Sequence, residues 1–221
     1  MSSDMITIKV GPAHVRYQVH EAILTHYSEY FLCALRSGLQ ECRTRVITLE
    51  DVHTCTFDAF LDWLYTQKLA TYDGWDDRYP CDESHYEDQK LVEVYAFADR
   101  FVVAKLKPVV MALLIHCFNN NDIPSHAAII FAVDNLPAES PVLRLLVDVF
   151  CRSWDAATSV QDEIPFEALP SSFLRQAILK YSSTVSGVRV LVKAEDYQEI
   201  VESKGEVVGR GSSKRKQKTR G

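Results

Sequence analysis

The sequence predicts an α+β fold: a small three-stranded sheet flanked by a cluster of helices, followed by an all-helical extension. Between residues 5 and 69 the apolar residues alternate, then recur at helical spacing, then form a β-rich run, and then become helical again. From residue 91 onward the apolar patterns are helical. With 221 residues, of which 47% are hydrophobic, the chain can bury a core of this size.

The first element predicted is a hairpin of two strands. Apolar and polar residues alternate over residues 5–10, Gly11-Pro12 breaks the pattern, and the alternation resumes over residues 15–19. The connection contains the two residues that most often mark a turn, so the strands are expected to pair directly.

Two short helices are predicted to meet near Ser28. The Ser28 hydroxyl can accept a hydrogen bond from a backbone N–H of the second helix's first turn, and Gly38 marks that helix's end. A β-rich run over residues 46–49 follows. A third helix then carries an apolar face made of Phe57, Phe60, Leu61 and Leu64.

Residues 70–89 are predicted to be an acidic loop insertion, because they carry seven acidic residues and show no apolar period. Helices are expected next over residues 91–102, over 109–118 after Pro108, and after Ser125 and Ser140-Pro141. Two more are possible, without an obvious partner surface, over residues 172–181 and 194–202. We expect an N-terminal domain at 1–120, a helical extension at 121–203 and a disordered basic tail at 204–221.

Residues at fixed spacing along the first half match a known family. They are Asp4, Ile6, Ile8, Tyr17, Val19, His20, Leu24, Ser28, Tyr30, Phe31, Leu35, Phe57, Phe60, Leu64, Tyr65 and residues 46–49 and 94–101. The segment resembles the BTB/POZ domain, in particular the short fungal type in which an aspartate begins the first strand. The resemblance extends weakly to about residue 155.

This resemblance implies a non-enzymatic protein–protein interaction module with two uses, self-association and docking onto a cullin scaffold of a ubiquitin ligase. The family's cullin contact is an apolar-x-Glu element after the second helix, and Leu39, Gln40 and Glu41 occupy that place. Leu39 could enter an apolar groove while Glu41 accepts hydrogen bonds at its rim. The alternative is a nuclear, transcription-related regulator that recruits partners through the same domain.

The resemblance also bears on the family's swapped dimer, which exchanges a strand and a helix that precede the aspartate. Only three residues precede Asp4 in this sequence, so we expect no dimer formed by that swap. Glu21 stands where such dimers often carry a basic residue, and it is expected to lie near Asp4 as a like charge. A homodimer through another surface stays open.

An enzyme is the main rival class, and no phosphate loop, dinucleotide fingerprint, zinc-protease motif or nucleophile elbow occurs in the sequence. Catalytic groups need converge only in space, so motif absence is weak evidence. His20 is expected to be a packed, hydrogen-bonded histidine. Cys81 and His85, with Asp82 or Glu87, could ligate a metal, but one loop rarely closes a zinc site. We therefore expect no catalytic residue, no metal and no cofactor.

The six cysteines are expected to be reduced. No C-x-x-C pair occurs, and four lie in apolar helical patterns where a thiol behaves as a small hydrophobe: Cys33, Cys55, Cys117 and Cys151. The sequence also shows no membrane span and no secretory signal, so we expect a cytoplasmic or nuclear protein.

Charge is distributed unevenly along the chain. The net charge is −6, but seven basic residues and one acidic residue from Lys204 onward give the tail +6, which leaves −12 on residues 1–203. The tail resembles a short nuclear-import signal, or is a solvated end, at Lys214, Arg215, Lys216 and Lys218. No folded reader with interleaved aromatic residues accompanies it, so we expect no nucleic-acid recognition.

The acidic segment has two interpretations. The plainer one is a solvated insertion that varies within the family. The other is an acidic patch for a basic partner, with Trp75, Tyr79 and Tyr86 as anchors.

Overall fold

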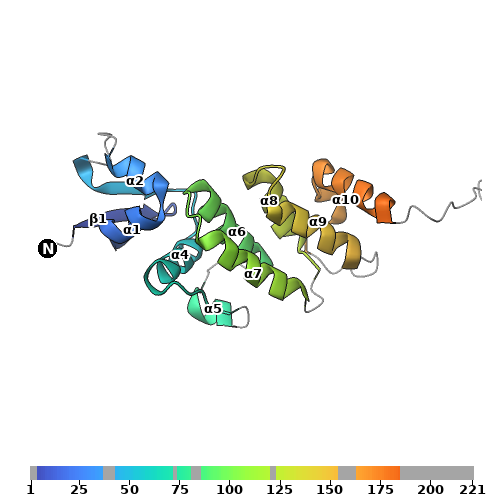
Figure 1. Ribbon diagram of the computed structural model, residues 1–221, viewed down its shortest axis with the longest axis horizontal. Helices are drawn as coiled ribbons and strands as arrows, with labels where there is room; N and C mark the ends of the chain where they lie inside the picture. Colours follow the sequence, from blue (N-terminus) through green and yellow to red (C-terminus); the bar gives the residue numbers. More distant parts are fainter. Residues whose placement is uncertain are drawn as a thin grey trace, which may run out of the picture. The chain divides into compact units, whose positions relative to one another are not determined.

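The computed structural model describes residues 4–36, 43–71, 74–80, 86–119, 123–153 and 163–184, all within one compact unit, Met1–Val185 (Figure 1). The elements are β1 Met5–Val10, β2 Val15–His20, α1 Glu21–Tyr27, α2 Glu29–Arg36, β3 Val46–Leu49, α4 Thr54–Thr66, α5 Trp75–Arg78, α6 Glu87–Arg100, α7 Leu106–Asn119, α8 His126–Asn135, α9 Pro141–Ser153, the 3-10 turn η3 Phe166–Ala168 and α10 Ser171–Thr184. The predicted α+β class, with its small three-stranded sheet and helical cluster, is confirmed.

The sheet has the strand order β2-β1-β3. β1 and β2 form an antiparallel hairpin whose register runs from the pair Met5 and His20 to the pair Val10 and Val15, and β3 lies parallel to β1. One face of β1 is fully buried against the helices: Ile6, Ile8 and Val10. Gly11 closes the hairpin with φ +70, a left-handed conformation that glycine adopts without strain.

Aromatic side chains join the helices that cover the sheet. The Phe31 ring of α2 stacks on Phe101 at 5.3 Å between centroids, and Phe97 of α6 lies 4.4 Å from Phe101 and 4.8 Å from Phe60 of α4. Such aromatic pairs add to the free energy gained by burying the rings. This cluster fixes α2, α4 and α6 against each other.

The helices of the extension, α8 to α10, pack next to α6 and α7. α8 contacts α6, α9 contacts α7 and α8, and α10 contacts α9 (Figure 1). No partner surface for α10 was expected from the sequence, and this expectation is wrong: Phe173 is buried and lies 5.4 Å from the ring of Phe150 in α9. The possible helix at residues 194–202 lies outside the described residues.

The two prolines predicted to begin helices differ in position. Pro141 is the first residue of α9, as predicted. α7 instead begins at Leu106, two residues before Pro108. Proline is tolerated there because N–H groups in a helix's first turn have no partner within the helix. The boundary predicted after residue 120 falls among residues that the structure does not describe, so the domain limits stay predictions.

The acidic segment is not entirely a loop, which corrects its predicted character. It contains the short helix α5, and Trp75 and Tyr79 are each only 2% exposed, with their rings 4.8 Å apart. These two aromatic residues are part of the protein's own core. They are therefore not available as anchors for a basic partner.

The cysteines agree only in part with the prediction that all six are reduced. Cys55, which is buried in α4, is disulfide-bonded, so the prediction of a reduced thiol is wrong at this position. Cys117 and Cys151 carry reduced thiols, as expected, and Cys117 is buried. Cys33 is free but exposed on α2, because it faces away from the buried stripe of Phe31 and Leu35.

The end of α6 is a Schellman motif with valine in the position that usually holds glycine. The Val103 N–H donates to the Ala98 carbonyl at 2.8 Å, and the Val102 N–H donates to the Asp99 carbonyl at 3.2 Å. Val102 has φ +52, and its side chain is 44% exposed. A β-branched residue is strained in this conformation, so the turn stores unfavourable free energy.

Val102→Gly is therefore expected to raise the free energy of unfolding, by up to about 1 kcal/mol, because relieved strain outweighs the added freedom of the unfolded chain. Thermal or urea unfolding of the full chain measures this. Val103→Gly is the matched control: Val103 is fully buried, so the same replacement one residue later should destabilise the protein. A lower midpoint for Val102→Gly would contradict the assignment of strain.

Candidate partner-binding surface

The residues that carry the family pattern lie mainly in the core. Val19, Leu24 and Phe31 are fully buried, and Ser28 is 1% exposed. Ser28 caps α2 as predicted, accepting a hydrogen bond from the Phe31 N–H at 3.2 Å, and its hydroxyl also donates to the Phe101 carbonyl at 2.5 Å. These side chains set the positions of the surface residues and do not themselves face a partner.

His20 is hydrogen-bonded, as predicted. Its Nδ1 lies 2.9 Å from the Tyr65 hydroxyl, and its backbone N–H donates to the same oxygen at 3.1 Å. The two rings meet edge to face, with their centroids 5.8 Å apart. Tyr65 lies in the last turn of α4 and is 45% exposed, so His20 ties the end of β2 to the last turn of that helix.

A charged cluster at the start of the sheet joins Asp4, Glu21 and Arg45. Glu21 lies near Asp4 as expected, since its N–H donates to the Asp4 carbonyl at 3.0 Å. The Arg45 guanidinium forms an ion pair with the Glu21 carboxylate and lies 3.9 Å from that of Asp4. Arg45 therefore offsets the like-charge repulsion that the sequence predicted. The predicted acidic pair is a three-residue cluster with a central cation.

A second polar cluster lies between α4 and α5. The Arg78 guanidinium donates to both Asp62 oxygens, at 2.8 and 3.1 Å, and the Tyr79 hydroxyl donates to Asp62 at 2.6 Å. The hydrogen bonds from Arg78 hold the pKa of Asp62 below its usual range, while burial raises the pKa of Tyr79 to about 12. Asp62 thus accepts as a carboxylate and Tyr79 donates as a neutral phenol, which fastens α5 to α4.

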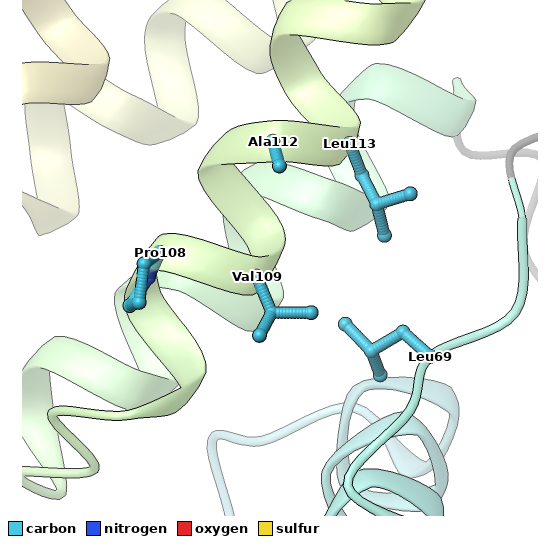
Figure 2. Close-up of a pocket in the computed structure, with 5 residues that line it drawn as sticks. All are labelled: Leu69, Pro108, Val109, Ala112 and Leu113. Carbon is cyan, nitrogen blue, oxygen red and sulfur yellow. The ribbon is translucent and has the colours of Figure 1, made fainter.

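An apolar groove lies along the first half of α7. We define it by its lining, Leu69, Pro108, Val109, Ala112 and Leu113, which borders an open space of about 490 Å³. Figure 2 shows the Leu69 side chain, from the segment after α4, pointing across the opening toward Val109. Sequence reasoning missed this groove. Its signal is the absence of any charged residue from Pro108 to Asn119.

Three sets of sequence-predicted site residues lie outside the described residues. They are the element Leu39, Gln40 and Glu41, the metal-ligand pair Cys81 and His85, and the basic residues Lys214, Arg215, Lys216 and Lys218. The connection that carries the first set begins after α2, which ends at Arg36, and leads to β3, which begins at Val46. Their roles stay predictions.

Within the described ranges, no cluster of three or more histidine, cysteine or acidic side chains could hold a metal ion. Of the helices that the structure describes, none is long and apolar enough to cross a membrane.

The buried family pattern and the small sheet with its cluster of helices are the fold of a class of protein–protein interaction modules. A family profile described as the BTB/POZ domain matches residues 3–117, which is more than half of the chain. The chain belongs to the BTB/POZ family, whose domains bind other proteins and are generally not enzymes. A comparison with curated proteins found no match.

Proposed function

We propose that this BTB/POZ protein, which we assign to the fungal type, is an adaptor that links a partner protein to a cullin-type ubiquitin ligase. The observation that carries the proposal is the position of Leu39, Gln40 and Glu41 in the connection between α2 and β3 of a chain that belongs to this family. A leucine anchor with an adjacent acceptor carboxylate concentrates binding free energy in few residues. The rest of the chain then presents the substrate.

Leu39→Asp is expected to reduce the recovery of a cullin with the tagged full chain at least about tenfold, since an anchor leucine contributes about 2 kcal/mol to an interface. Affinity purification followed by mass spectrometry measures this recovery. The matched control is Leu179→Asp, the same change at a leucine that is 63% exposed on α10. Equal cullin recovery with wild type and Leu39→Asp would remove this contact from the proposal.

The second candidate is a nuclear regulator that recruits partners through the BTB/POZ domain. Its support is the basic run Lys214, Arg215, Lys216 and Lys218, which matches a short import signal. Deleting residues 210–221 should lower the nuclear fraction of the tagged protein. An unchanged nuclear fraction would dismiss the import signal, and transcription-related proteins without a cullin in the purification would favour this candidate over the adaptor.

A further inference from the structure

The apolar groove on α7 has the dimensions of a binding site and no polar group in its lining side chains. The space of about 490 Å³ that its lining borders is open to solvent along one side, so it admits a row of side chains better than an enclosed small molecule. Water in such a groove forms few hydrogen bonds with the walls. Displacing it with apolar side chains is therefore favourable.

The groove continues along the helix beyond its lining residues. Pro108, Ala112 and Ile115 follow one another at helical spacing, and Ile115 is 43% exposed. This stripe of α7 spans about two helical turns, or roughly 11 Å. A straight stripe of that length matches the apolar face of a single helix laid along α7.

Two lysines adjoin the lining of the groove in the sequence, one before Leu69 and one before the first residue of α7. Lys68 is exposed and directly precedes the lining residue Leu69. Lys105 is exposed and directly precedes α7, with its ammonium 5.3 Å from the centroid of the Tyr27 ring. Unpaired N–H groups in the first turn of a helix add partial positive charge at the same end. The uncharged groove thus has an electropositive start, which favours a partner with acidic residues at the matching end.

We propose that the α7 groove binds an amphipathic helix of a partner protein, with the apolar side chains of that helix in the groove and its acidic end near Lys68 and Lys105. The carboxyl-terminal end of the bound helix, with its partial negative charge, suits the same position. The partner helix therefore runs antiparallel to α7. This site rests on the interaction-module class alone and is independent of the cullin contact.

The probe is a fluorescein-labelled synthetic helix of about 15 residues, with leucines on one face and glutamates toward its carboxyl end. Its binding to the full chain is followed by fluorescence anisotropy. Ala112→Glu should weaken binding at least tenfold, and Ala112→Gln, which adds nearly the same bulk without charge, should weaken it less. Ala112 is exposed, so neither change disturbs the core. Ile178→Glu places the same charge on the exposed face of α10 and should leave binding unchanged.

Charge is tested with a second peptide in which every glutamate is replaced by lysine. It should bind at least tenfold more weakly than the acidic peptide at low salt, and the difference should shrink as salt screens the lysines. Equal binding of the two peptides, or no effect of Ala112→Glu, would overturn the proposal. A dimer seen by light scattering that Ala112→Glu abolishes would also overturn it, because the occupant would be a second copy. Leu39→Asp should leave peptide binding intact, which separates this site from the cullin contact.

Discussion

Asp88→Ala is expected to lower the free energy of unfolding by about 3 kcal/mol. The Asp88 side chain lies in the first turn of α6 and is only 7% exposed. One carboxylate oxygen accepts hydrogen bonds from the Gln89 N–H and the Ser125 hydroxyl, both at 2.9 Å, and the other accepts from the Ser125 N–H at 2.8 Å. Removing the carboxylate leaves these donors without an acceptor in a site that water barely reaches.

Removing the Asp88 carboxylate also destabilises a second helix, α8. The Ser125 hydroxyl caps α8 by accepting from the Ala128 N–H at 3.1 Å, and Asp88 holds that hydroxyl in place. One carboxylate thus joins the start of α6 to the start of α8. Loss of the carboxylate loosens the helical extension where α8 meets α6.

Chemical denaturation of the full chain measures the effect, and Glu87→Ala is the matched control. Glu87 is an acid in the same turn of α6, so its removal costs only the interaction with the helix dipole, about 0.5 kcal/mol. Equal destabilisation by the two variants would mean that the dipole, and not the shared hydrogen bonds, accounts for the role of Asp88.

The strands and most of the helices could be predicted from the sequence because their apolar periods are local. Alternation at Ile6, Ile8 and Val10 specifies which face of β1 is buried, since a strand's side chains point to alternate faces. The caps at Ser28 and Ser125 could be predicted for the same reason. A serine hydroxyl reaches backbone N–H groups only two or three residues away.

The acidic segment could not be predicted correctly because its stabilising partner lies elsewhere in the sequence. Seven acidic residues indicate solvent exposure, but Tyr79 and Arg78 both bind Asp62 of α4. Arg45 was missed for a similar reason, because the acids that it contacts, Asp4 and Glu21, come from the two ends of the hairpin. Long-range ion pairs leave no period in a sequence.

The two candidate surfaces differ in the same way: one could be predicted from a local sequence pattern, and the other could not. The three residues Leu39, Gln40 and Glu41 form a continuous motif, so resemblance alone could indicate them. The α7 groove combines Leu69 with four residues of a helix that begins after α6, and only folding brings them together. A charge-free helix face indicates an unpartnered surface once the structure shows that the face is exposed.

Ser28→Ala is expected to lower the free energy of unfolding by about 2 kcal/mol, the second largest effect on stability among these predictions. The Ser28 hydroxyl makes two buried contacts, accepting from the Phe31 N–H in α2 and donating to the Phe101 carbonyl at the end of α6. Alanine removes both. It leaves one N–H and one carbonyl unsatisfied beside the stacked rings of Phe31 and Phe101, where no water replaces them.

The matched control is Ser182→Ala. The Ser182 hydroxyl donates to the Leu179 carbonyl at 2.9 Å but is exposed, so water replaces that hydrogen bond and the expected change stays below about 0.5 kcal/mol. Urea unfolding of both variants gives the comparison.

Combining Ser28→Ala with Val102→Gly tests coupling at the end of α6, because Val102 directly follows the Phe101 carbonyl that Ser28 binds. If Ser28 were only a local cap of α2, the two changes would add; non-additivity shows that its hydroxyl also holds the turn after α6.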